Sequence, residues 1–240
     1  MRKIRLYMGQ TLAIHTNIML GTSQAHYLLH VLRLGVDSEF CLFNERDGEF
    51  LAKLQIAKKQ AVSANIVSFI RGIEKEQNIL FCFAPIKKLR LDYMIQKLVE
   101  MGATAIQPVQ THYTQDAKLN YDKIIANTIE AAQQCGRISL PIINKICSLE
   151  NLLNNWNNKY HLLFCDEKAL TRENFINLKM VDKDFAIIIG PEGGFSEYEQ
   201  QLLLKQPFVS PISLGKNILR ADTAAVASLA LVNSILLQNR

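Results

Sequence analysis

The sequence has few of the residue patterns that would point to a metalloprotein or a secreted protein. Its five cysteines are scattered and include no Cys-x-x-Cys pair, so neither a zinc site nor a disulfide framework is expected. His26 and His30 lie one helical turn apart, but the His-Glu-x-x-His pattern is absent and no third ligand accompanies them. We therefore predict no metal, and reduced thiols in a cytoplasmic protein.

A long uninterrupted apolar run is also missing. The run at residues 221–237 approaches the length of a membrane span, but it is interrupted by Asp222, Ser228, Asn233 and Ser234. It is predicted to be a helix that is buried in the core or faces another subunit. The first five residues carry charges with no apolar segment behind them, which is not the pattern of a signal peptide. No membrane association is expected.

What the sequence does contain is enough apolar residues for a sizeable core: 49% are hydrophobic and 20% are charged. The net charge of +5 is unevenly placed. Residues 1–72 hold nine Lys or Arg against five Asp or Glu, whereas residues 73–240 hold eighteen against seventeen. A basic surplus in a small N-terminal region fits attraction to a polyanion such as RNA, although a merely solvated surface accounts for it equally well.

Residues 1–72 are predicted to form a small β-barrel with one helix. The helix covers 23–33, with Ser23 as N-cap and Gly35 as stop signal. Strands are expected at 40–44, 48–57 and 61–70, with a hairpin turn at Asp47-Gly48. The charged segment 71–78 has no apolar periodicity, so we place a domain boundary there, between residues 72 and 73.

Residues 73–240 alternate between apolar runs and helical patterns. Strands are predicted at 79–85, 105–109, 161–165 and 185–189, and helices at 91–101, 122–135 and 196–205, with a short helix and turn near 149–158. The helix at 196–205 opens with a capping-box sequence, Ser196 to Glu199. This alternation predicts an α/β domain whose parallel sheet is covered on both faces.

Two glycine-containing stretches dominate the C-terminal part. Gly190-Pro191-Glu192-Gly193-Gly194 and Leu214-Gly215-Lys216-Asn217-Ile218-Leu219-Arg220 each follow an apolar run and precede a helical pattern. Ligands of open α/β sheets bind at the carboxyl ends of strands, and glycine lets the backbone approach a ligand closely. We therefore predict that both loops together form one ligand-binding site. Neither loop matches a dinucleotide or nucleoside-triphosphate fingerprint.

These two stretches resemble the signature of the SPOUT methyltransferases, and within them the family that methylates N3 of a uridine in 16S ribosomal RNA. The similarity extends over nearly the whole chain. It includes His26 to Gly35, the segment 96–108 with Gln96-Lys97 and Ile106-Gln107-Pro108, and Glu130 to Arg137.

The resemblance implies a C-terminal SPOUT domain with a trefoil knot, an N-terminal PUA-like RNA-binding β-barrel and a homodimer. It implies S-adenosyl-L-methionine as methyl donor and 16S ribosomal RNA, within the small ribosomal subunit, as partner. The residues that would bind the donor are Gly190, Pro191, Glu192, Gly193, Gly194, Leu214, Gly215, Ile218, Leu219 and Thr223.

Catalytic roles are predicted for Arg220, Glu192 and Asp222: Arg220 as the cation that stabilises the developing anion, and a carboxylate as base. Glu192 is as well explained as a brace for its own glycine loop. RNA contacts are predicted for His26, His30, Arg33 and Arg137, although a merely solvated helix face accounts for His26, His30 and Arg33 about as well.

The chain departs from the family pattern at three places. Thr111-His112-Tyr113-Thr114 stands where an acidic-Arg-Ser run is usual, Asn217 replaces a common arginine, and Asp222 replaces a glutamate. Two other functions stay open: a SPOUT enzyme that modifies another RNA position, such as a ribose 2′-hydroxyl or a tRNA base, and a noncatalytic RNA-binding protein.

Overall fold

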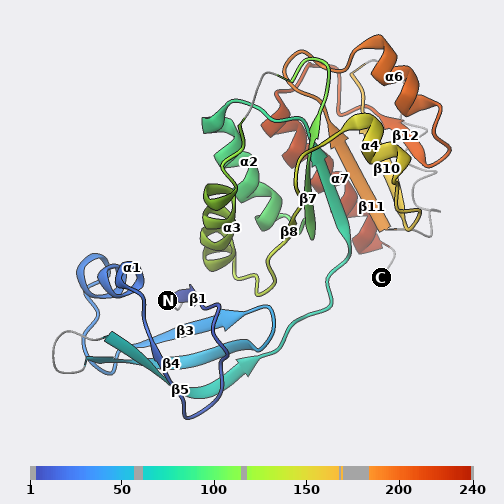
Figure 1. The fold of residues 1–240 in the computed structure, drawn as a ribbon. Coiled ribbons are helices and arrows are strands. Elements are labelled where there is room, and N and C mark those ends of the chain that lie inside the picture. Colours follow the sequence, from blue (N-terminus) through green and yellow to red (C-terminus); the bar gives the residue numbers. More distant parts are fainter. Residues whose placement is uncertain (1–3, 57–61, 115–117, 168, 170–183, 239–240) are drawn as a thin grey trace. The chain divides into compact units, whose positions relative to one another are not determined.

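Figure 1 shows the fold in a computed structural model, which describes residues 4–56, 62–114, 118–167, 169 and 184–238. The chain forms two compact units. The first contains Met1–Lys75 and Ala132–Leu140, and the second contains Glu76–Ala131 and Pro141–Arg240. The sequence does not predict the return of the chain to the first unit at Ala132–Leu140, because helical periodicity continues through its first residues.

The first unit is built on a curled five-stranded sheet. Its strands are β1 (Arg5–Tyr7), β2 (Asn17–Met19), β3 (Glu39–Asn44), β4 (Gly48–Ile56) and β5 (Val62–Arg71), in the order β1-β3-β4-β5-β2. The β1–β3 pair is parallel and the others are antiparallel. Apolar side chains such as Phe40, Leu42 and Leu54 fill one core, and burying a side chain of this size stabilises the fold by roughly 1.5–3 kcal/mol. The predicted small barrel-like domain is confirmed.

The predicted helix at 23–33 is confirmed in a modified form, but its N-cap is Gly21 rather than the expected Ser23. It consists of α1 (Thr22–His26) followed by a π-helical turn, η1 (Tyr27–Val31). Leu28 of η1 is fully buried, and Leu34 packs against the same apolar core of the first unit. Arg33 then leaves the helix with a φ of 54°, a left-handed conformation that a non-glycine residue rarely adopts.

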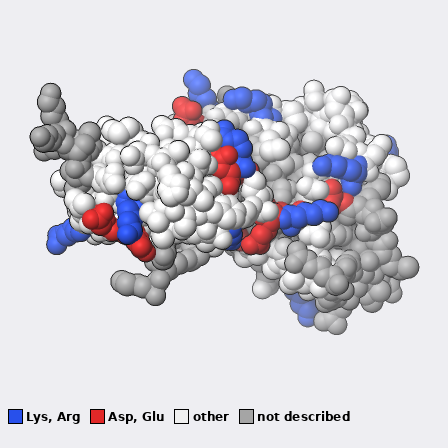
Figure 2. Space-filling view, turned by 90° about the horizontal axis from the view of Figure 1, so that it is seen from below, with Lys and Arg blue, Asp and Glu red and all other residues white. Residues whose placement is uncertain are grey.

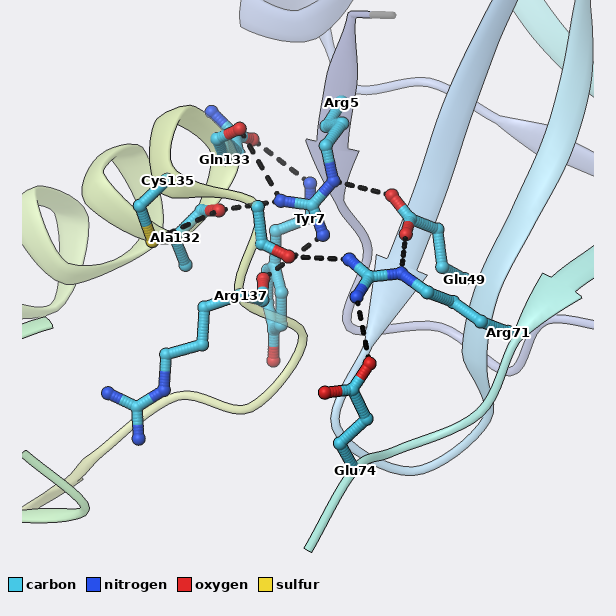
Figure 3. A network of polar contacts seen from close by, with 10 residues as sticks. Arg5, Tyr7, Glu49, Arg71, Glu74, Ala132, Gln133, Cys135 and Arg137 are labelled. Atoms are coloured by element: carbon cyan, nitrogen blue, oxygen red, sulfur yellow. Dashed lines mark hydrogen bonds and ion pairs between the residues drawn. The ribbon is translucent and has the colours of Figure 1, made fainter. Parts of the chain in front are cut away.

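An arginine–glutamate network connects the sheet of the first unit to the C-terminal end of α3 (Tyr121–Cys135), which belongs to the same unit (Figure 3). Arg5 donates to the carbonyls of Ala132 and Arg137 at 2.6 and 3.1 Å, and Arg71 donates to that of Gly136 at 2.5 Å. Because the last carbonyls of a helix have no partner within it, arginines stabilise this end. Glu49 lies between the two arginines and accepts from both.

The second unit contains a parallel sheet in the order β12-β10-β11-β6-β7-β8, with β9 pairing with β7. Its main strands are β6 (Ile79–Phe83), β7 (Ala105–Gln110), β10 (Tyr160–Cys165), β11 (Asp184–Ile189) and β12 (Val209–Ile212). Two short strands, β8 (Ile142–Ile143) and β9 (Cys147–Ser148), complete it. The parallel α/β architecture is as predicted.

Successive side chains of these strands enter two different cores, as the alternation of a strand requires. In β11, Phe185, Ile187 and Ile189 pack with α2 (Lys88–Glu100) and α7 (Ala221–Gln238), whereas Ala186 and Ile188 face the other core. That second core includes α4 (Leu149–Asn154) and α6 (Glu197–Leu204). Helices therefore cover both faces of the sheet (Figure 1).

Two local predictions are confirmed in detail. Ser196 accepts a hydrogen bond from the amide of Glu199, and the Glu199 carboxylate accepts from the amide of Ser196 at 2.9 Å, so the capping box is complete. The apolar helix at the C-terminus is α7, which buries Ala225, Leu229 and Val232 fully. Within the described ranges, no helix has both the length and the apolar character that crossing a membrane requires.

Candidate functional site

The main candidate site is a cavity of about 620 Å³ in the second unit. It lies where β10, β11 and β12 end, and its wall is formed by the residues that follow each of these strands: Asp166, Gly190 and Leu214. β10 pairs with both β11 and β12, so these ends are neighbours in one sheet. The site therefore occupies the carboxyl edge of the sheet, where open α/β folds bind ligands.

The two glycine loops shape this cavity by close backbone approach. A Cβ on Gly190 would lie 2.9 Å from a ring carbon of Phe195, and one on Gly193 would lie 3.1 Å from the Cβ of Tyr113. Gly215 has a φ of 131°, which a residue with a side chain rarely adopts. Because these glycines have no side chain, the loop backbone stays accessible to a ligand. This explains why the sequence has glycine at these positions.

Charged groups of both signs reach the cavity. Asp166 and Glu167 follow β10, and Glu192 lies on the first glycine loop. The Glu192 carboxylate forms an ion pair with Arg90 of α2, with 3.6 Å between Oε1 and Nη1. Carboxylates beside apolar lining residues such as Phe164, Leu214 and Leu219 suit a ligand that has both a cationic group and apolar parts.

A buried glutamate fixes the loop that follows β7 to the first glycine loop. Glu199 is 5% exposed, and its carboxylate accepts from the amide of His112 at 2.7 Å as well as from the amide and hydroxyl of Ser196 at 2.9 Å. The next residue, Tyr113, consequently packs against Gly193. One carboxylate thus positions two loops that lie more than 80 residues apart in the sequence.

Cys165 contributes an uncharged side chain to the wall of the cavity. Burial raises the pKa of its thiol to about 12, against a smaller lowering by a hydrogen bond with Ser228. The thiol is therefore protonated at neutral pH and is a weak nucleophile.

The structure brings most of the predicted donor-binding residues together. The cavity is lined by Gly190, Pro191, Glu192, Gly193, Gly194, Leu214, Gly215, Ile218, Leu219 and Arg220. Asp222 and Thr223 lie in the first turn of α7, where Asp222 accepts a hydrogen bond from the amide of Thr223 at 3.1 Å. Among the residues described, these two do not line the cavity, whereas their neighbours Ala221 and Ala224 do.

The residues predicted to contact RNA all lie in the first unit. His26 and His30 are exposed, and their rings lie 4.9 Å apart. Arg33 is exposed just after η1, and Arg137 donates to the hydroxyl of Ser139 at 3.1 Å. On the face drawn in Figure 2, basic side chains often lie beside acidic ones, and wide areas carry neither. Their RNA contacts remain predictions.

Sequence reasoning did not identify several residues of the cavity. Arg90, Tyr113, Asp166 and Glu167 were not predicted as site residues, although all four line it. A signal existed for Asp166 and Glu167, because an acidic pair directly follows the predicted strand at 161–165. No local pattern marks Arg90, which reaches the site from a helix. In the part of the chain that the structure describes, no cluster of three or more His, Cys, Asp or Glu is arranged to hold a metal ion.

Comparison with known proteins gives consistent matches over the whole chain. A model described as an RNA methyltransferase domain matches residues 74–233, and one described as an RNA methyltransferase PUA domain matches residues 20–67. Ribosomal RNA small subunit methyltransferase E of Rickettsia conorii is 33% identical over 235 residues, which cover 97% of this chain and 96% of that protein.

Solved structures give the same result. A methyltransferase from Legionella pneumophila in complex with the cofactor SAM has a TM-score of 0.86 at 27% identity, with 98% of each chain covered. Ribosomal RNA small subunit methyltransferase E from Neisseria gonorrhoeae, bound to S-adenosyl methionine, has a TM-score of 0.82 at 25% identity, again with 98% of each chain covered.

Proposed function

The chain belongs to the ribosomal RNA small subunit methyltransferase E family, and on this basis we propose that it methylates N3 of one uridine in 16S ribosomal RNA, with S-adenosyl-L-methionine as donor. The observation that carries the proposal is the single cavity formed by both glycine loops at the carboxyl edge of the sheet. Its volume of about 620 Å³ is within the usual range for ligands of this size.

The lining of the cavity fits the donor chemically. S-adenosyl-L-methionine supplies a methyl group on a positively charged sulfur. Side chains of Phe164, Leu214 and Leu219 offer apolar surface, and the exposed loop backbone offers donors and acceptors for an adenine. The carboxylates of Asp166, Glu167 and Glu192 favour a cation electrostatically.

The reaction requires that uracil N3 lose its proton while it forms a bond to the methyl carbon and the carbon–sulfur bond breaks. We assign the stabilisation of the resulting negative charge on the uracil to Arg220, which lines the cavity just before α7. A positioned cation of this kind acts through preorganised electrostatics. Glu192, held by Arg90, is the first candidate for the base that accepts the proton, and Asp222 is the second.

The remaining assignments follow from the family and complete the proposal. Residues 1–72, supplemented by 132–140, are assigned to RNA binding, and the rest of residues 73–240 to donor binding and catalysis. We place the protein in the cytoplasm as a homodimer that acts on the small ribosomal subunit. Support for a reducing compartment is that none of the five cysteines, all of which lie within the described ranges, forms a disulfide. Light scattering after size-exclusion chromatography tests the dimer.

Two measurements test the function. Calorimetric titration with S-adenosyl-L-methionine should give a saturable 1:1 isotherm per chain, whereas a noncatalytic RNA-binding protein without a donor site would give none. Mass spectrometry of 16S ribosomal RNA from a deletion strain should show the loss of one N3-methyluridine that the wild-type gene restores. If the 16S RNA instead loses a ribose methyl group, or if tRNA from the same strain loses a base methyl group, the chain acts on another RNA position.

A further inference from the structure

A second cavity, of about 570 Å³, lies in the second unit. It is next to the cavity of about 620 Å³ that is proposed to bind the methyl donor, here called the donor cavity. The two cavities share four lining residues: Tyr113, Pro191, Glu192 and Gly193. An occupant of the second cavity would therefore lie directly beside an occupant of the first. Methyl transfer requires this relationship between acceptor and donor.

The second cavity has an apolar floor and a basic rim. Ile86, Leu91 and Ile124 are buried and form part of the floor. Lys87 and Lys88 at the start of α2, together with Lys118 and Lys123 near the start of α3, lie on the rim. This combination suits a ligand with a flat apolar part and an anionic part.

The rim lysines differ in what they already bind. Lys123 forms an ion pair with Asp92, which also accepts from Asn127 at 2.9 Å. Lys87 and Lys88 are exposed, and the described residues place no carboxylate within ion-pair distance of either. Their ammonium groups are available to an anion, and a phosphate is the anion that a nucleic acid presents most often.

Tyr113 gives the shared wall an aromatic surface. The residue is 50% exposed, although the adjacent amide of His112 is anchored to the buried Glu199 and its own Cβ packs against Gly193. A fixed, half-exposed aromatic ring on the wall of a cavity offers a stacking surface to a nucleobase. Its place in the fold thus differs from that of Tyr198, an exposed tyrosine on α6 that lines neither cavity.

We infer that the second cavity receives the pyrimidine nucleotide that is to be methylated, with its base against Tyr113 and its backbone phosphate at Lys87 and Lys88. This inference rests on the proposed function and specifies where its substrate binds. A base in a paired stem must leave its stack to reach such a cavity, so the enzyme binds an unpaired or flipped uridine.

The test compares full-length variants on small-subunit ribosomal RNA, with the donor affinity of each measured separately by calorimetry. The variants are Tyr113→Ala, Tyr113→Phe and the double variant Lys87→Ala/Lys88→Ala. Tyr198→Ala and Lys205→Ala serve as matched controls, because both residues belong to the second unit and lie outside the two cavities.

Loss of a stacked base should weaken RNA binding by Tyr113→Ala about tenfold, whereas Tyr113→Phe, which keeps the ring, should bind like wild type. Loss of two phosphate contacts should weaken RNA binding by the double lysine variant and reduce the slope of log Kd against log salt by about 1.5. Donor affinity should stay unchanged in the double lysine variant, because Lys87 and Lys88 do not line the donor cavity, and in Tyr113→Phe, which keeps the ring. A merely structural role of the two lysines would not produce this result.

The inference is overturned if Tyr113→Ala and the double lysine variant bind and methylate RNA as the two controls do. It is also overturned if the double lysine variant loses donor affinity to the same extent as RNA affinity. If the wild-type chain binds the donor but transfers no methyl group to small-subunit RNA, the proposed function itself fails, and the inference fails with it.

Discussion

Arg5 and Glu49 form a nearly fully buried ion pair: 2.5 Å separates Nε from Oε1, and the side chains are 7% and 5% exposed. The second carboxylate oxygen of Glu49 accepts from Arg71 at 2.6 Å. Both arginines also donate to carbonyls at the end of α3 (Figure 3). A single carboxylate therefore bridges the two cations that hold the chain segment 132–140 within the first unit.

Glu49→Gln should destabilise the first unit strongly, because it leaves the buried Arg5 with no compensating charge and Arg71 with only the exposed Glu74. Breaking a buried pair in this way costs about 3–5 kcal/mol of unfolding free energy. Glu74→Gln is the matched control: Glu74 also pairs with Arg71, at 3.4 Å, but its side chain is 79% exposed, and such pairs contribute about 0–1 kcal/mol. Equal denaturation midpoints for the two variants would refute the structural role of Glu49.

Gly190→Ala should weaken donor binding and lower stability. The new Cβ would lie 2.9 Å from the ring of Phe195 and 3.3 Å from the carbonyl carbon of Gly194, so either the ring or the loop has to move. Overpacking of this kind costs about 1–3 kcal/mol. Gly9→Ala, whose Cβ would meet nothing within 4 Å, is the control. Calorimetry and urea denaturation measure both effects, and an unaltered donor affinity in Gly190→Ala would contradict the prediction.

Arg220→Ala should reduce methylation of ribosomal RNA by a factor of about 10²–10³, while donor affinity and melting temperature stay close to wild type. Arg220 lies in the loop before α7 and its side chain is exposed, so its loss should leave the core unaffected. Lys216→Ala removes an exposed cation from the same loop without altering the cavity lining and should keep full activity. Wild-type turnover by Arg220→Ala would remove this residue from the mechanism.

Asp47 should make the first unit sensitive to acid. Hydrogen bonds from Arg46, from the amide of Leu12 and from Asn44 hold the pKa of its carboxyl well below the ordinary value. A lowered pKa means that folding favours the ionised form, so this stabilisation is present above about pH 4, the pKa of an unfolded aspartate, and is lost as the pH falls below it.

The corresponding experiment compares wild type with Asp47→Asn in denaturation curves between pH 7 and pH 2. The stability difference between the two should be largest at neutral pH and should shrink below pH 4. The control Glu150→Gln changes an exposed carboxylate on α4 and should show no such trend. A difference that is constant over the whole pH range would show that Asp47 acts through shape rather than through its charge.

The sequence by itself determined the alternation of strands and helices, the capping box at Ser196 and the two glycine loops. These are local features: periodicity of apolar residues, cap residues and glycine are all visible within a few positions. The glycine loops also marked most of the donor cavity, because in a parallel sheet the strand ends before such loops lie at one edge.

Only the tertiary structure decided which residues from distant parts of the sequence contact these local features. Glu199 fixes the loop at His112 across 87 positions, and Arg90 reaches Glu192 on the first glycine loop from α2. Arg5 lies 127 positions from the carbonyl of Ala132 that it binds. Such pairings leave no periodic signal in the chain, because they depend on strand order and on packing between elements rather than on the conformation of any one segment.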